Sequence, residues 1–239
     1  MEDVVAVRVD VKIMAHPVRR PYVEELLDQL DRDVEVVWDS QPRPSRDPRQ
    51  RWRVARRAWL SMDQEADWGL VLQDDAVVCQ DLVAGVEKAL DHIGTEGLAS
   101  FYTGTGRPDQ ENVQRALATA AEGGHSWLST RSLNWGVAIC APIPTIRDMV
   151  RWSSHPGRGA WKTDYRVGVY YRDVAHYRTW YTAPSLVEHR GVPSLVGHDT
   201  GPVRRAHNFI GTNVSALTVD WARTPRDFTP YLPVEPRRR

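Results

Sequence analysis

Lysine and net charge are both scarce in this chain of 239 residues. Of its 31 basic residues only Lys12, Lys88 and Lys162 are lysine, and 31 acidic residues bring the formal net charge to zero. A neutral chain is not a wholly basic nucleic-acid-binding protein, although a local basic patch stays compatible with zero net charge. The arginine bias is typical of a GC-rich genome and by itself indicates no function.

Cysteine and long apolar runs are scarce as well. The two cysteines, Cys79 and Cys140, both lie in apolar stretches, where we expect buried, reduced thiols. No apolar run approaches the roughly 18–20 residues that span a bilayer. The first residues lack a basic stretch followed by an apolar one, which predicts no secretory signal and a cytoplasmic location.

The abundant features favour one globular domain. Hydrophobic residues make up 41% of the chain, and it contains 10 tryptophans against 3 phenylalanines. Because the indole N–H needs a partner, we expect some of these tryptophans to line a site rather than to fill the core. The length suffices for a core without disulfides or a structural metal. We therefore expect a single domain over residues 1–232 and a basic tail over residues 233–239.

Strand and helix patterns alternate along the first half of the chain. Apolar runs predict strands over residues 4–14, 34–38, 68–78 and 98–102, the third of them interrupted by Gln73-Asp74-Asp75. One-sided apolar stripes predict helices over residues 21–30, 49–62 and 82–93, the last with Asp81 as its N-cap. In the second half, helices are expected over residues 108–122, 144–152 and 164–171, and extended segments over residues 135–141 and 177–188. The alternation predicts an α/β fold with a mixed, mostly parallel sheet flanked by helices.

Polar side chains stand at the ends of several predicted strands. His16, Asp39 and the pair Asp74–Asp75 fall at or near carboxyl ends, where open α/β sheets bind ligands. Two adjacent carboxylates within an apolar run are costly to bury, and a divalent cation such as Mg²⁺ or Mn²⁺ is the usual compensation. The alternative is a strand that ends at Asp74, with both acids solvated or capping a turn. The apolar residues on both sides favour the metal site.

Residues 53–59 (RVARRAW) and 68–75 (WGLVLQDD) together resemble the core of GT-A-fold glycosyltransferases. In that family a helix of this kind precedes a strand that ends in a DxD or Glu-Asp-Asp motif. The resemblance implies that Asp75 binds the metal that grips the diphosphate of a nucleotide sugar, with Asp74 as a supporting ligand or sugar contact. Gln73 stands where many members have Glu, which implies an uncharged contact to the ribose.

The same resemblance extends to the second half of the chain. It implies a nucleotide-sugar-binding half over about residues 1–105 and an acceptor-side half over residues 106–232. Residues 183–189 (APSLVEH) resemble the Pro-Ser-Leu-Val/Phe-Gln-His segment of several N-acetylglucosaminyltransferases, and are similar to small bacterial and phage transferases. Many GT-A enzymes complete the metal site with a late histidine, which implies His189 through a neutral imidazole nitrogen. His198 is the alternative ligand.

Asp164 and Trp135 are the acceptor-side candidates. Inverting members of the family use an acid at the start of a late helix as general base, and Asp164 follows a Gly-rich loop and opens a predicted helix. The alternative is an acid that complements the helix dipole, and Asp173 is a weaker candidate base. Residues 133–138 (LNWGVA) resemble the Gly-containing strand that shapes the pocket. Trp135 in that strand is either a stacking face for a sugar or a core residue.

Seven arginines against one acid crowd the stretch before and within the second predicted helix. Guanidinium groups suit diphosphate oxygens or nucleic-acid phosphates. We expect Arg53 or Arg56 to contact the donor, although a solvated helix face is the commonest meaning of such a run. By the resemblance, His16 and Arg19 lie where the family holds the nucleoside, and Asp39 lies where it contacts the nucleobase or ribose.

The leading interpretation is a metal-dependent glycosyltransferase that uses Mn²⁺ or Mg²⁺ and a nucleotide sugar, with a UDP-sugar expected first. The acceptor stays open between a hydroxymethylated DNA base, as in phage DNA modification, and a protein; a phage-encoded enzyme acts in the host cytoplasm. One alternative is a nucleotidyltransferase, against which the lack of glycine in residues 15–19 counts. The other is a non-catalytic DNA- or sugar-binding protein. Inverting and retaining stereochemistry both stay open.

Overall fold

A seven-stranded sheet forms the centre of the molecule, and the predicted α/β fold with a mixed, mostly parallel sheet is confirmed. The computed structural model describes residues 6–105, 110–195 and 204–221. The strand order is β2-β1-β3-β7-β5-β8-β6, and β7 and β6 run antiparallel to the other five strands. These strands are β1 (Val9–Ala15), β2 (Glu35–Trp38), β3 (Trp68–Gln73), β5 (Gly97–Ser100), β6 (Trp127–Thr130), β7 (Ala138–Pro142) and β8 (Arg178–Thr182).

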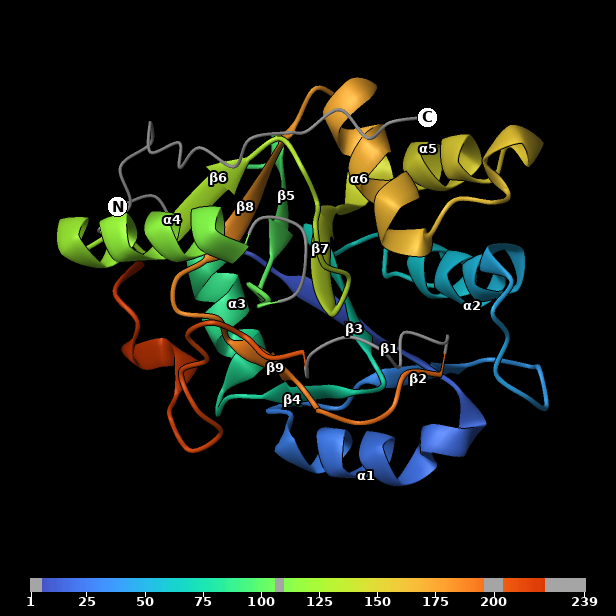
Figure 1. The fold of residues 1–239 in the computed structure, drawn as a ribbon, viewed down its shortest axis with the longest axis horizontal. Helices are drawn as coiled ribbons and strands as arrows, with labels where there is room; N and C mark the ends of the chain where they lie inside the picture. The colour runs from blue at the N-terminus through green and yellow to red at the C-terminus, as the bar shows by residue number, and fades with distance from the viewer. Residues whose placement is uncertain (1–5, 106–109, 196–203, 222–239) are drawn as a thin grey trace.

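Helices cover both faces of the sheet, as Figure 1 shows. One group of helices packs together over β1, β3, β7 and β8: α2 (Pro48–Leu60), α5 (Ile143–Ser153) and α6 (Thr163–Asp173). The remaining helices lie elsewhere around the sheet: α1 (Arg20–Gln29), α3 (Leu82–Leu90) and α4 (Gln110–Gly123). Three short 3-10 turns complete the described elements: Pro17–Arg19, Pro156–Arg158 and Ala216–Thr218.

The chain reverses its direction across the sheet at β1. It passes from β1 through α1 to β2 on one side, and then through α2 to β3 on the other side of β1. Because parallel crossovers are right-handed, this reversal sends α1 and α2 to opposite faces, and they lie on different sides of β1 in Figure 1. The carboxyl ends of β1 and β3 therefore lie at the switch point of the sheet, which is where α/β sheets of this kind bind ligands.

A second, two-stranded sheet corrects two sequence-based predictions. The apolar run 68–78 is not one strand: β3 ends at Gln73, Asp74 and Asp75 form a turn, and β4 (Ala76–Val78) leaves the main sheet. β4 pairs antiparallel with β9 (Val187–His189). The extended segment 177–188 is likewise divided between β8 and β9, with a cis Ala183–Pro184 peptide between them. Buried residues lie on both sides of the break in each run, so burial alone does not mark where the chain changes sheets.

Two further expectations differ from the structure. The sequence pattern does not predict β6, because this strand has four residues and two of them are polar. Asp81 precedes α3 as expected, but its side chain accepts no bond from that helix and its backbone φ is 54°. Instead the Asp31 carboxylate accepts hydrogen bonds from Val83 N (2.8 Å) and Ala84 N (2.9 Å). An acid distant in sequence therefore supplies the cap that the local pattern assigned to Asp81.

One continuous hydrophobic core lies between the sheet and its helices. Its largest fully buried side chains include Trp59, Trp68, Trp127 and Trp221, so several of the tryptophans fill the core. Cys79 and Cys140 are buried and free, as expected. Within the described residues, no helix is long and apolar enough to cross a bilayer.

Candidate functional site

The pairing of β1 with β3 brings two of the predicted segments together. Their parallel register sets Met14 beside Gln73, so the residues that follow each strand meet at the same edge of the sheet. His16 and Arg19 follow β1, and Asp74 and Asp75 follow β3. All four side chains are at most partly exposed, and Arg19 is only 4% exposed.

Arg19 and the two acids form a buried charged cluster. The Arg19 guanidinium donates to Asp75 Oδ2 at 2.5 Å and lies 3.4 Å from Asp74 Oδ1. Its second terminal nitrogen donates to Pro193 O at 2.9 Å, and His16 N donates to Asp74 Oδ2 at 2.8 Å. One guanidinium thus pairs with two carboxylates, so Arg19, Asp74 and Asp75 together carry a net charge of about −1 when both acids are ionised.

His189 joins this cluster through the small sheet. The β4–β9 register pairs Ala76 with His189, and the imidazole Nε2 lies 3.4 Å from Asp75 Oδ2. Arg190 N also donates to the backbone oxygen of Asp75 at 2.7 Å. The structure therefore brings His189 to Asp75, as the resemblance implied. His198, the alternative metal ligand, lies outside the described residues.

The electrostatics of Asp74 reflect this crowding. Burial, and then the neighbouring charge of Asp75, raise the pKa of Asp74 to about 7. The positive charge of Arg19 and the N–H of His16 act in the opposite direction. A carboxyl group in this state holds or loses its proton near neutral pH, and further positive charge at the site would favour its ionised form.

Three buried polar atoms around the cluster have no hydrogen-bond partner among the described residues: Asp75 Oδ1, His189 Nδ1 and His16 Nε2. An orphaned carboxylate oxygen is costly unless a ligand completes it. Asp75 Oδ1 and the imidazole of His189 are donors that suit Mn²⁺ or Mg²⁺. No group of three or more His, Cys, Asp or Glu side chains that could hold a metal exists among the described residues. Asp75 and His189 would therefore offer a metal about two protein ligands, and its remaining positions would be left to a bound ligand or water.

Asp164 approaches this edge of the sheet from the other side. A Cβ added to Gly136 would lie 3.0 Å from Gln73 Nε2 and 3.2 Å from Asp164 Cβ. The side chains of Gln73 and Asp164 therefore converge on one point where only a glycine fits without displacement. Since Gln73 directly precedes the two acids, the predicted base and the predicted metal site border one region. Asp164 Oδ1 accepts from Tyr165 N at 2.9 Å, which also fits the alternative of a first-turn helix residue.

Two neighbours fix the surroundings of Asp164. The Tyr181 hydroxyl accepts from Asn134 N at 2.7 Å and donates to Ser132 O at 3.1 Å, which anchors the segment that leads to Gly136. Arg51 is partly buried beside Asp164: burial lowers the pKa of Arg51, and the Asp164 charge opposes that shift. Arg51 therefore brings positive charge to the predicted base.

Sequence reasoning missed Arg166, which holds the loop before Asp164. The Arg166 side chain is 2% exposed and donates to Trp161 O (2.6 Å), Ser153 O (3.1 Å) and Gly159 O (3.3 Å). Its guanidinium also lies 4.8 Å from the ring centroid of Trp52. No sequence signal distinguishes it from an exposed helical arginine, because its partners are carbonyl groups.

Other predicted residues lie farther from these contacts. Arg53 and Arg56 are exposed on α2, and among the described residues no hydrogen bond or ion pair joins them to Asp74 or Asp75. Asp39 accepts from Gln41 N at 3.0 Å at the end of β2. Trp135 is 9% exposed and packs edge-on against Tyr102 and Tyr181, which favours the core role over a stacking face. Donor contacts by Arg53, Arg56 and Asp39 stay predictions.

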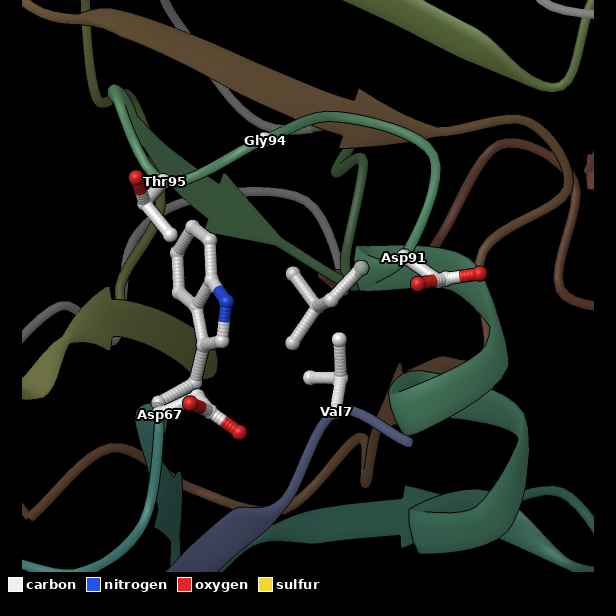
Figure 2. Close-up of a pocket in the computed structure, with 7 residues that line it drawn as sticks. Val7, Asp67, Asp91, Gly94 and Thr95 are labelled. Carbon is white, nitrogen blue, oxygen red and sulfur yellow. The ribbon is translucent and has the colours of Figure 1, made fainter. Parts of the chain in front are cut away.

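A hollow of about 270 Å³ lies at the opposite edge of the sheet. Val7 and Asp67, which precede β1 and β3, line it together with residues that follow α3. Figure 2 shows the carboxylate of Asp91 pointing away from Val7 and Asp67. Asp67 already accepts from Arg8 N at 2.8 Å. The polar groups of this hollow do not converge on a ligand, and it has no part in the charged cluster.

No protein-family model and no curated protein matches the chain. Among solved structures, the chain is similar to a mannose-1-phosphate geranyltransferase from Thermus thermophilus, with 13% identity, 74% of each chain covered and a TM-score of 0.38. It is also similar to a glycosyltransferase involved in the glycosylation of the major capsid of PBCV-1, with 10% identity and a TM-score of 0.38. That match covers 80% of this chain and 97% of the other. With scores this low, functional inference depends on the site itself.

Proposed function

We propose that the protein is a glycosyltransferase that moves a sugar from a nucleotide sugar to an acceptor hydroxyl. The proposal rests on one observation above all. The buried Asp75 and the partly buried Asp74 follow β3 and share the guanidinium of Arg19, which follows β1, and Asp164 approaches the same region beside Gln73. The proposed donor-binding residues and the proposed base thus border one region.

The donor side is the cluster of Asp74, Asp75, Arg19 and His189. Asp75 and His189 would hold Mn²⁺ or Mg²⁺, with Asp74 in support; when bound, the ion supplies positive charge that offsets the negative charge of the departing diphosphate. Arg19 orients Asp75 and adds a second positive charge near the phosphates. Gln73 offers an uncharged amide to a hydroxyl group of the donor.

The acceptor side is formed by Asp164. Its carboxylate accepts the proton of the acceptor hydroxyl as that oxygen bonds to the anomeric carbon. The bond from the anomeric carbon to the phosphate oxygen breaks, and the nucleoside diphosphate leaves with the electron pair. Arg51 places positive charge beside the carboxylate of Asp164. Arg166 holds the loop that carries Asp164 in position.

For the donor we propose a UDP-sugar, and for the acceptor a hydroxymethylated DNA base or a protein. The first test is thermal unfolding with UDP, GDP, CDP or TDP, each with Mn²⁺, Mg²⁺ or EDTA. A ligand at 100 times its Kd adds about 2.7 kcal/mol to the free energy of unfolding. We expect stabilisation by UDP that EDTA abolishes and that Asp75→Asn removes, each variant being compared with its own ligand-free state.

Two variants sharpen this test. Asp148→Asn removes an acid on α5 whose side chain is 60% exposed and pairs with Arg151 at 2.8 Å, so it controls for the charge change and keeps the UDP response. Asp164→Asn keeps the UDP response and loses sugar transfer. Release of pyrophosphate from a nucleoside triphosphate and a sugar phosphate would instead identify a nucleotidyltransferase. DNA or sugar binding without any nucleotide response would identify a non-catalytic binder.

A further inference from the structure

Residues 43–57 form the most one-sided charged segment of the chain. They contain seven arginines and one acid, Asp47, and so carry a net charge of +6 in a chain whose net charge is zero. Asp47 is the N-cap of α2, and its Oδ1 accepts from Arg49 N at 2.8 Å. The one acid of the segment is thus engaged with backbone and leaves the arginines unneutralised.

The exposed arginines of α2 are Arg49, Arg53, Arg56 and Arg57, which we call the α2 basic face. None of them forms an ion pair with another described residue. Exposed arginines elsewhere do find acids, as Arg8 does with Asp63 at 2.7 Å. A neutral protein that places four neighbouring guanidinium groups without a described acidic partner concentrates positive potential there.

Packing fixes the direction in which this face points. The other side of α2 is buried in the core through Trp52, Ala55, Ala58 and Trp59. The Trp52 indole donates to Ser154 Oγ of the turn after α5 at 3.0 Å, which prevents rotation of the helix about its axis. The arginines at positions 49, 53 and 56 then share one solvent-facing stripe by their i, i+4, i+7 spacing.

The α2 basic face borders the acceptor side of the proposed site. A Cβ added to Gly159 would lie 2.8 Å from Arg49 Nε, so the start of α2 touches the turn before α6. Arg51, two residues further along the same helix, acts electrostatically on Asp164. Figure 1 shows α2 beside α5 and α6. A partner that lies along the start of α2 therefore meets the turn that precedes α6, whose first turn carries Asp164.

The shape and composition of the face indicate the kind of partner. α2 has 13 residues, and a helix of that length is about 20 Å long. Guanidinium groups spread over such a length suit an extended polyanion rather than one phosphate. Among the described residues, Leu60 at the end of α2 is the one large exposed apolar side chain on this helix. Protein partners need an apolar interface core, whereas nucleic-acid backbones do not.

We propose that the α2 basic face binds the phosphate backbone of a nucleic acid beside the turn that precedes α6. The inference rests on the proposed function for its meaning, since it selects DNA over protein as the acceptor. Nucleic-acid binding can be measured apart from catalysis. Contacts of Arg49 and Arg53 to phosphates would need neither a particular base sequence nor the sugar donor.

Fluorescence anisotropy of a labelled DNA duplex of about 30 base pairs, measured over a range of salt concentrations, tests the proposal. Each phosphate contact adds about 0.9 to the slope of log K against log salt. We expect Arg49→Gln/Arg53→Gln to weaken binding at least tenfold at low salt and to reduce the slope by roughly two. The matched control is Arg115→Gln/Arg131→Gln, which removes the same charge from exposed positions on α4 and after β6 and keeps the wild-type slope.

Other outcomes overturn the proposal. Equal losses in both double variants would mean that net charge and not the α2 basic face drives binding. Competition by polyglutamate as strong as by DNA, at equal charge concentration, would indicate an acidic protein as the partner. Absence of duplex binding by the wild type at low salt would refute it outright. DNA binding without stabilisation by UDP would leave this surface standing and refute the donor site instead.

Discussion

Arg19→Gln is the substitution that tests the charged cluster most directly. The Arg19 side chain is buried, and it is the single guanidinium shared by Asp75 at 2.5 Å and Asp74 at 3.4 Å. Removing one partner of a buried pair costs about 3–5 kcal/mol, because the remaining charge stays buried without compensation. Glutamine also loses the bond to Pro193 O. We expect Arg19→Gln to lower the free energy of unfolding by at least about 3 kcal/mol in EDTA.

The same variant separates Arg19 from the metal. The guanidinium occupies Asp75 Oδ2, so a divalent ion at Asp75 shares that carboxylate with it. Without Arg19 the acid is open to the ion, and we expect Mn²⁺ to bind about tenfold more tightly, or about 1.4 kcal/mol. Urea unfolding at about pH 7.5, on the ionised side of a carboxyl group of raised pKa, with and without Mn²⁺, measures both effects.

The neighbouring residue supplies the control for both measurements. Arg20 is exposed, and its guanidinium lies 4.7 Å from the ring centroid of Trp38. Arg20→Gln should cost about 1 kcal/mol or less and leave Mn²⁺ binding unchanged. If Arg19→Gln is no less stable than Arg20→Gln, the ion pair to Asp75 is energetically unimportant. If Mn²⁺ stabilises both variants equally, Arg19 does not compete for the carboxylate.

Three further predictions concern the acceptor side and the fold. Gly136→Ala pushes against Gln73 and Asp164 at 3.0 and 3.2 Å; we expect kcat/KM to fall about tenfold with unfolding nearly unchanged, and an unaltered rate would refute the convergence. Arg166→Met orphans buried carbonyl groups and should cost about 3 kcal/mol in urea unfolding; a loss below about 1 kcal/mol would contradict its role as the anchor of that loop. Burial lowers the pKa of His207 below its usual 6.5, so the unfolded chain binds more protons and stability falls as pH drops below about 6.5. His207→Asn should flatten that part of the stability–pH curve, and an unchanged curve would assign it to other groups.

The residues of the charged cluster were predictable because strand ends are visible in sequence. An apolar run followed by Asp74 and Asp75 marks the end of a strand, and His16 marks another. Their meeting follows from the rule that carboxyl ends of parallel strands share an edge. The partner of Arg19 was not predictable: the resemblance associated it with the nucleoside. The structure pairs it with Asp75, 56 positions away, through the register of β1 and β3.

The second sheet could not be predicted from the same pattern. β4 and β9 are largely buried like the strands that precede them, and the interruptions at residues 73–75 and 183–184 do not show that the chain changes sheets there. Only the pairing of Val78 with Val187 reveals that both runs leave the main sheet together. That departure makes the turn at Asp74 and brings His189 to Asp75.

The charges of the cluster also imply an order of binding. Asp74 and Asp75 carry two negative charges when ionised, and the positive charge of Arg19 neutralises one of them. A diphosphate that approaches this site alone meets a net negative field, which opposes binding. With a divalent ion present, the same residues become net positive and attract the diphosphate.

The pKa of Asp74 is about 7. Protonation of Asp74 at low pH makes the metal-free cluster less negative, whereas at high pH both carboxylates that attract the ion are ionised. We therefore expect UDP without metal to bind better at about pH 6 than at about pH 8, one unit either side of that pKa, and Mn²⁺, which the ionised carboxylate attracts, to bind better at about pH 8. Titration calorimetry of UDP alone and of Mn²⁺ alone at the two pH values measures this, and parallel trends for the two ligands would show that the charge of the cluster does not control binding at this site.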